Sequence, residues 1–228
     1  MVKATTKSFE IEIDKGNVYR SLGYGNGRGP SSSISSLIDE EIEEAYGFIH
    51  PSCSYQLMDI KRIRRPRVTL ENSITISITS EVLSWVLYPC QQAVIFVSSI
   101  GHGLEERVSQ LMKEGQILKP TILDTIGSEA AEKTACHLQE MVRDLATSNG
   151  AEITLRYSPG YCDWDITQQR ILFEIMDSAP MGVSLNKECL MMPRKSLSGI
   201  IGLGWGEKRR LRLSPCRFCT KQDCKNRR

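Results

Sequence analysis

The sequence contains no hydrophobic run that is long enough to cross a membrane. A spanning helix needs about 18 consecutive residues that are mostly apolar, and no stretch of the 228 residues reaches that length. Residues 1–7, MVKATTK, also lack the apolar segment of a secretory signal peptide. We therefore expect a cytoplasmic protein with no membrane partner.

An excess of charge of either sign is absent too. The chain has 29 Lys and Arg against 27 Asp and Glu, which gives a formal net charge of +2. Such a balance creates no global field that would recruit nucleic acid or a membrane surface. The basic run at residues 61–67 has no interleaved aromatic side chains and is typical of a solvated segment. We expect no nucleic-acid partner.

Histidine is scarce, and glycine is concentrated in one place. The histidines are His50, His102 and His137, and none has a second histidine at the spacing of a helical metal site. The glycine-rich residues 23–30 lack the Gly-Lys-Ser/Thr ending of a phosphate-binding loop. They predict a loop. The simplest interpretation is a plain connection, the next is a segment that contacts a partner, and the least favoured is a phosphate-binding site.

Cysteine, by contrast, is plentiful. Three of the eight cysteines stand close to the end of the chain, as Cys216, Cys219 and Cys224 in a C-x2-C-x4-C spacing, which argues against a secreted disulfide framework. This spacing lets three thiolates converge on one zinc ion or iron–sulfur cluster, with Cys162, Cys53 or an external group as the fourth ligand. The alternative is three reduced thiols in a basic tail that binds no metal.

The pattern of apolar residues predicts an α+β fold. Apolar residues that alternate with polar ones predict strands, and apolar stripes of helical period predict helices. Strands and helices that follow one another without regular alternation favour α+β over a doubly wound sheet, and short turns between strands favour antiparallel pairing. Strands are expected at residues 8–13, 53–59, 67–70, 74–79, 92–98, 152–157, 182–185 and 197–203, and helices at 80–88, 103–114, 119–147 and 165–178.

An additional amphipathic helix is predicted after Ser31. Serines at the start of this segment are good helix caps, and a stripe of apolar residues follows them at helical spacing. The stripe consists of Ile34, Leu37, Ile38, Ile42 and Ala45. The acidic residues between them are expected to face solvent, and these are Asp39, Glu40, Glu41, Glu43 and Glu44.

The segment Arg156-Tyr157-Ser158-Pro159-Gly160-Tyr161 has the residues of a small-molecule site. It follows an apolar strand and turns at a Pro-Gly pair, where glycine permits close approach of a ligand to the backbone. The guanidinium of Arg156 matches a carboxylate, and the ring of Tyr161 can lie over a cation. The segment therefore suits a zwitterionic ligand, although local turn chemistry alone is equally consistent with a strand-to-helix corner.

Together with residues 193–199, PRKSLSG, this segment resembles the activation domain of cobalamin-dependent methionine synthase. That family has an Arg-x-x-x-Gly-Tyr stretch and a later Pro-x-x-Ser-x-Ser-Gly stretch in the same order. The resemblance covers about residues 90–205. It implies an α+β domain, a twisted antiparallel sheet with flanking helices, at residues 1–205, followed by a Cys-rich basic tail at residues 206–228.

The resemblance also implies a function. In that family the domain binds S-adenosylmethionine and presents its methyl group to a cobalamin, so that inactive Co(II) is reductively methylated. The sequence has no Asp-x-His-x-x-Gly run of a cobalamin-carrying domain, so the corrinoid is expected on a partner. That partner would be a corrinoid-binding protein or a methionine synthase that lacks its own activation domain, with an electron donor such as flavodoxin or ferredoxin.

Transferred to this sequence, the family pattern places the ligand contacts at seven residues. Arg156 would bind the methionine carboxylate, Tyr161 would cover the ligand, and Glu132 would bind the ammonium or ribose. The full set is Arg156, Ser158, Gly160, Tyr161, Glu132, Ser196 and Ser198.

Two departures from the family pattern leave other functions open. Residues 162–165, CDWD, replace a Pro-x-Cys-Pro run, and Ile200 and Ile201 replace aromatic residues. One alternative is a small metal or iron–sulfur electron-transfer protein that acts on corrinoid proteins. Another is a scaffold that only binds the corrinoid partner.

Overall fold

The structure of the chain is a computed structural model. It describes residues 3–7, 9–25, 28–176, 181–206, 211, 213–221 and 223.

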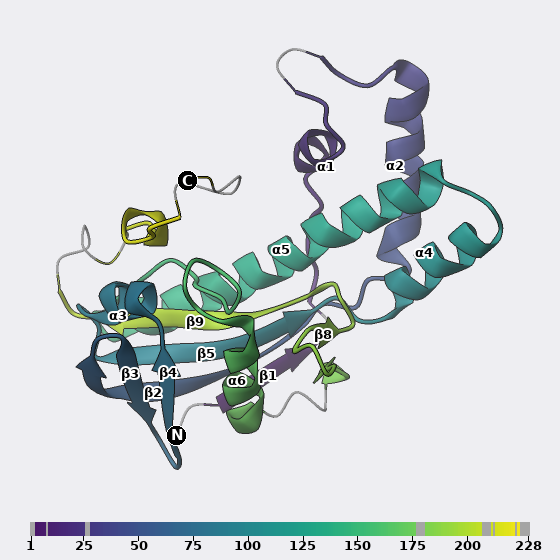
Figure 1. The fold of residues 1–228 in the computed structure, drawn as a ribbon. Helices are drawn as coiled ribbons and strands as arrows, with labels where there is room; N and C mark the ends of the chain where they lie inside the picture. The colour runs from purple at the N-terminus through teal and green to yellow at the C-terminus, as the bar shows by residue number, and fades with distance from the viewer. Residues whose placement is uncertain are drawn as a thin grey trace.

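In this described part, seven strands form one twisted antiparallel sheet (Figure 1). Its long central strands are β2 (Ser52–Arg64), β5 (Gln92–Ser99) and β9 (Ser196–Gly204). Around them lie β1 (Lys3–Lys7), β3 (Arg67–Glu71), β4 (Thr75–Thr79) and β6 (Glu152–Ile153), in the order β4-β3-β2-β5-β9-β6 with β1 paired to β2. The short strands β7 (Ser184–Leu185) and β8 (Met191–Met192) pair with each other. The predicted α+β class and antiparallel pairing are confirmed.

Burial along β5 shows that the centre of the sheet is covered on both faces. Successive residues of a strand point to opposite faces. On one face, Ile95 and Val97 join a cluster with residues of α3 and α6. On the other, Val94 and Phe96 join a cluster with residues of α5. The sheet is therefore the middle layer of three, which explains why residues 93–97 of β5 are all apolar.

The helices differ greatly in length. They are α1 (Lys15–Ser21), α2 (Ser32–Tyr46), α3 (Glu81–Leu87), α4 (Gly103–Lys113), α5 (Leu118–Ser148) and α6 (Gln169–Ile175), with 3₁₀ turns η1 (Ile166–Gln168) and η3 (Pro215–Arg217). With 31 residues, α5 is about 46 Å long. Its C-terminal half packs on the sheet, and its N-terminal half extends past the sheet to α2 and α4 (Figure 1). None of the helices in the described ranges has the length and apolar character that a bilayer crossing demands.

Four predicted elements differ from the structure, and one of them is the strand at 182–185, which shortens to β7. The strand expected at residues 8–13 is wrong, because the strand is β1 at Lys3–Lys7 and residues 9–13 form no ladder; residue 8 lies outside the described residues. Ile13 packs in the helical cluster, and its N–H donates to Tyr46 Oη at 3.1 Å. The strand predicted at 152–157 is shorter in the structure, where it consists of β6 and a single bridge at Tyr157. The helix predicted at 165–178 is divided into η1 and α6, and residues 177–178 lie outside the described part.

The expected solvent face of α2 needs one correction. Ser31 caps the helix as predicted, accepting a hydrogen bond from the N–H of Ile34. Glu41, however, is fully buried, and one of its carboxylate oxygens lies 2.7 Å from Lys119 Nζ. The N-terminal end of α5 covers this face of α2, and a buried carboxylate requires an oppositely charged partner. The pattern of α2 alone contains no information about that neighbour.

Candidate functional site

Arg156 lies along one face of α5. Its Nη2 is 3.1 Å from Glu132 Oε2, its Nε donates to Gln139 Oε1 at 2.9 Å, and Nη2 is 3.6 Å from Cys136 Sγ. These three residues of α5 are four and three positions apart, which places them on the same helix face. The Arg156 side chain is 19% exposed and that of Glu132 is 54% exposed. A guanidinium and a carboxylate therefore stand side by side at the surface.

The backbone next to Arg156 is fixed to β9. Tyr157 and Ile200 exchange two hydrogen bonds, with N···O distances of 3.0 and 2.8 Å. The Tyr157 side chain enters the cluster on the α6 face of the sheet. Because neighbouring residues of an extended segment point to opposite faces, Arg156 is directed to the α5 face.

Gly199 of β9 permits a close approach of this segment to the sheet. A Cβ atom at position 199 would lie 2.6 Å from Tyr157 O and 2.9 Å from Ser158 Oγ. Only glycine fits so near a neighbouring backbone. Gly199 thus has a packing role, because it lets the segment that carries Arg156 lie close to β9.

The turn at Gly160 is internally bonded. Gly160 has φ of +90°, in the left-handed region that favours glycine. Its N–H donates to Trp164 O at 2.7 Å, and the N–H of Trp164 donates to Tyr161 O at 3.0 Å. The Gly160 N–H is thus already used within the turn. Tyr161 projects outward and is 54% exposed, so its ring is accessible to a ligand or a partner.

The unusual residues after Tyr161 anchor the turn. Trp164 is buried and stacks on Tyr157 with ring centroids 5.5 Å apart. The Asp163 carboxylate accepts hydrogen bonds at the N-terminus of α3, from Ser80 Oγ at 2.7 Å, the N–H of Glu81 at 2.5 Å and the N–H of Val82 at 3.3 Å. This departure from the family pattern has a structural reason.

Lys195, in the second motif, contacts the same face of α5. Its Nζ is 2.8 Å from Asp124 Oδ1 and 2.8 Å from Ser128 Oγ. Positions 124, 128, 132 and 136 are each four residues apart and form one continuous stripe. Lys195 lies at one end of this stripe and Arg156 at the other. The candidate site is the α5 surface between these two side chains.

Two predicted contacts lie on the opposite side of β9. Ser196 Oγ hydrogen-bonds with Ser99 Oγ and the carbonyl oxygen of Pro193, and Ser198 Oγ donates to Gln169 Oε1 of α6 at 2.9 Å. Both serines are buried. The structure therefore brings Arg156 and Glu132 together, with Ser158, Gly160 and Tyr161 on the adjoining segment, and does not gather Ser196 and Ser198 with them.

Several site residues were missed from sequence. Gln139 and Cys136 contact Arg156, and Asp124 and Ser128 contact Lys195. Their spacing of four, seven or eight residues from Glu132 was the available signal, because it places them on one face of a helix that was itself predicted.

The cysteines that were expected to bind metal are partly brought together. Cys216 and Cys219 lie near Cys162, the residue considered as a fourth ligand. Partial burial, with these two thiols, raises the pKa of Cys162 to about 11. Cys53 is buried in the cluster beneath α5, and Cys224 lies outside the described residues. Where residues are described, no three or more His, Cys, Asp or Glu side chains are arranged to hold a metal ion.

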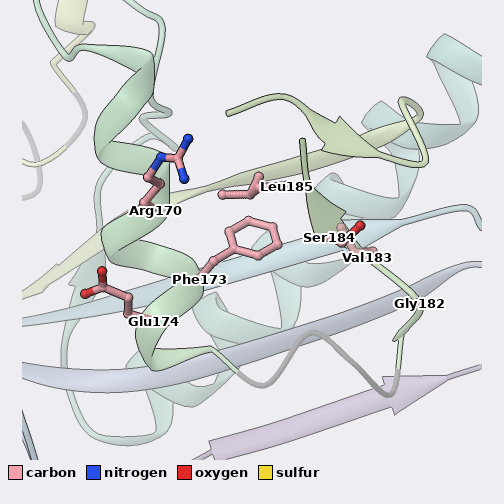
Figure 2. Close-up of a pocket in the computed structure, with 7 residues that line it drawn as sticks. All are labelled: Arg170, Phe173, Glu174, Gly182, Val183, Ser184 and Leu185. Carbon is pink, nitrogen blue, oxygen red and sulfur yellow. The ribbon is translucent and has the colours of Figure 1, made fainter. Parts of the chain in front are cut away.

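A separate hollow of about 670 Å³ lies between α6 and β7 (Figure 2). Arg170 and Phe173 of α6 line one side of the hollow, and Ser184 and Leu185 line the opposite side. The Arg170 guanidinium is already used, since it donates to Lys187 O and contacts Cys189 Sγ. No predicted ligand contact lines this hollow.

Comparisons with known proteins agree with the fold. Residues 89–205 match the family described as vitamin B12 dependent methionine synthase, activation domain. A crystal structure of the MetH reactivation domain bound to AdoHcy is similar, with a TM-score of 0.70 and 14% sequence identity, over 91% of this chain and 80% of that chain. No curated protein matches the sequence.

Proposed function

This chain belongs to the family of vitamin B12-dependent methionine synthase activation domains, and we propose that it binds S-adenosylmethionine and supports reductive methylation of a corrinoid on a partner protein. The partner is a methionine synthase without its own activation domain or another corrinoid methyltransferase. The similar MetH domain was crystallised with AdoHcy, the product that S-adenosylmethionine leaves after methyl transfer, which supports this class of ligand.

The observation that carries the proposal is the contact between Arg156 and Glu132. An amino acid has a carboxylate and an ammonium on the same carbon, so it needs a cation and an anion close together. Arg156 offers a planar fork for the carboxylate, and Glu132, 3.1 Å away, offers an acceptor for the ammonium. Without ligand the two groups neutralise each other, and the ligand exchanges their mutual contact for two charge-assisted hydrogen bonds.

The chain's contribution is position and charge rather than a nucleophile. S-adenosylmethionine supplies an electrophilic methyl group, and a reductant such as flavodoxin or ferredoxin supplies one electron for each Co(II) restored. The sulfonium loses its charge as it becomes the thioether of S-adenosylhomocysteine. The exposed ring of Tyr161, on the segment that follows Arg156, covers the ligand, and the docking of this segment at Gly199 holds Arg156 in position.

Calorimetric titration with S-adenosylmethionine tests the proposal. Wild-type protein is expected to bind at sub-millimolar concentration, and Arg156→Ala to bind about 30- to 100-fold more weakly, as expected for loss of a hydrogen-bonded charge. Arg156→Lys should recover only part of this loss, because lysine lacks the fork. Arg143→Ala is the matched control, since Arg143 pairs with Glu140 elsewhere on α5. Absence of binding by the wild type, or equal binding by Arg156→Ala, overturns the proposal.

A spectroscopic assay tests the corrinoid step. The protein is mixed with a Co(II) corrinoid partner, a reductant and S-adenosylmethionine, and the cobalt spectrum is followed. Conversion to the methylated corrinoid that requires all components is expected. Partner binding that is unaffected by S-adenosylmethionine, with no spectral change, identifies a scaffold instead.

A further inference from the structure

Gln139 contacts Arg156 at the one donor that lies nearest the main chain. Gln139 Oε1 accepts a hydrogen bond from Arg156 Nε at 2.9 Å. Because Nε can only donate, the amide oxygen of Gln139 is the atom that faces it. This hydrogen bond is partly buried, whereas the contact between Arg156 and Glu132 is exposed. The uncharged partner of the guanidinium is therefore better shielded from water than the charged one.

The other donors of Arg156 lie at the far end of the guanidinium. An arginine has one N–H on Nε and two on each terminal nitrogen. Nη2 contacts Glu132 Oε2 and Cys136 Sγ. In the part of the chain that the structure describes, no protein group accepts a hydrogen bond from Nη1. The edge formed by Nη1 and Nη2 is thus the one left for a carboxylate, which two parallel N–H groups bind well.

The tip of Arg156 needs an anchor beyond its main chain. The neighbouring backbone is fixed, since the N–H of Tyr157 donates to Ile200 O at 3.0 Å. The arginine side chain, however, is long and has large rotamer entropy, and an exposed ion pair such as that with Glu132 restrains it little. Because the guanidinium is planar, a hydrogen bond at Nε also sets the direction of the opposite edge.

We propose that Gln139 is a positioning residue of the candidate site, which holds Arg156 through Nε so that the edge formed by Nη1 and Nη2 is directed at the ligand carboxylate. This role rests on the proposed function. When the ligand ammonium takes the place of Arg156 beside Glu132, the contact with Gln139 persists and keeps the guanidinium in position.

The neutrality of the Gln139 amide is part of this role. Arg156 and Glu132 give the site one positive and one negative charge, which match the carboxylate and the ammonium of an amino acid. A carboxylate at position 139 would accept the same hydrogen bond and add a second negative charge beside Arg156. That charge would repel the ligand carboxylate and attract a ligand that has only the amine. Glutamine supplies the hydrogen bond without the charge.

Calorimetry on the full chain with two ligands tests this role. The ligands are S-adenosylmethionine and its decarboxylated form, which keeps the amine and lacks the carboxylate. Gln139→Met has a similar length without the amide oxygen. It should bind S-adenosylmethionine about 5- to 10-fold more weakly, as expected for loss of one hydrogen bond, and the decarboxylated ligand within about 2-fold of the wild type. Gln110→Met, at an exposed glutamine of α4, is the matched control and should bind both as the wild type does.

The variant Gln139→Glu separates positioning from packing. We expect it to bind S-adenosylmethionine about 5- to 10-fold more weakly and the decarboxylated ligand more tightly than the wild type, because the added charge acts with opposite sign on the two ligands. A defect in local packing would weaken both. Thermal unfolding checks that each variant is folded.

Two results would overturn the positioning role while leaving the proposed function intact. One is wild-type affinity for S-adenosylmethionine in Gln139→Met. The other is a loss of similar size for both ligands in either variant, which would make Gln139 a structural residue of α5. Absence of S-adenosylmethionine binding by the wild-type protein would instead overturn the proposed function, and the role of Gln139 with it.

Discussion

The guanidinium of Arg156 lies 3.1 Å from the carboxylate of Glu132, although the two residues are 24 positions apart in the sequence. One comes from the segment that follows β6 and the other from the middle of α5. Because α5 both packs on the sheet and extends beyond it, its residues between Asp124 and Gln139 meet the two motif segments. This relationship turns two separate sequence motifs into one candidate site.

Glu132→Gln is expected to weaken S-adenosylmethionine binding by about 5- to 30-fold, or about 1–2 kcal/mol, because the neutral amide is a poorer partner for an ammonium. Stability should change by less than about 0.5 kcal/mol, since an exposed ion pair contributes little. Calorimetry and urea unfolding measure the two effects. Glu140→Gln, at an exposed pair on the same helix, is the control. If Glu132→Gln keeps the wild-type affinity for S-adenosylmethionine, Glu132 is only the partner of Arg156 in a surface ion pair and not a ligand contact.

Gly199→Ala is expected to destabilise the fold by about 1–3 kcal/mol, as overpacking does, and to weaken ligand binding. The added methyl group would meet Tyr157 O and Ser158 Oγ and displace the segment that carries Arg156. Gly206→Ala is the matched control, because a Cβ at that position meets nothing within 4 Å. Thermal unfolding and calorimetry check both effects. Equal behaviour of the two variants would show that β9 tolerates a side chain there.

Asp163→Ala is expected to lower the free energy of unfolding by about 1–2 kcal/mol, the usual cost of losing a helix cap. Its carboxylate accepts from Ser80 Oγ and from the N–H groups of Glu81 and Val82. Urea unfolding measures the loss. Asp144→Ala, at an exposed position of α5, should be nearly neutral. A loss of similar size in both variants would contradict the capping role.

Stability is expected to fall at alkaline pH through Cys90. Burial raises the pKa of the Cys90 thiol from 9.0 to about 12. Below pH 9 the thiol is neutral in both the folded and the unfolded chain, so its ionisation takes nothing from the free energy of unfolding. Between the two values only the unfolded chain ionises, and stability falls by about 1.4 kcal/mol per pH unit. Above the folded pKa the loss is complete.

The variant Cys90→Ala isolates this effect. It should be less stable than the wild type near neutral pH, because it leaves a cavity, and the difference should shrink as pH rises from about 9 to 11. Urea unfolding over that range provides the measurement. Parallel stability curves for the two proteins would exclude Cys90 as the titrating group.

Local pattern was sufficient for most elements of the fold. The long helix predicted at 119–147 is α5 at Leu118–Ser148, and the strand predicted at 92–98 is β5 at Gln92–Ser99. Periodicity reports which face of an element is buried, so it succeeds where one element packs in a regular way. It failed for residues 9–13 and for Glu41, where the burial depends on contacts with α2 and with Lys119.

The sequence by itself determined the α+β class, the capped helix after Ser31 and, through the resemblance, the family; it also predicted Arg156 and Glu132 as ligand contacts. The tertiary structure alone decided that Gln139 lies on the same face of α5 as Glu132, that Lys195 contacts this face, and that Ser196 and Ser198 point to the other side of β9. The physical reason is that the spacing of apolar residues shows which face of each helix or strand is buried. The contacts between side chains that are distant in the sequence depend on how the helices and strands pack against one another.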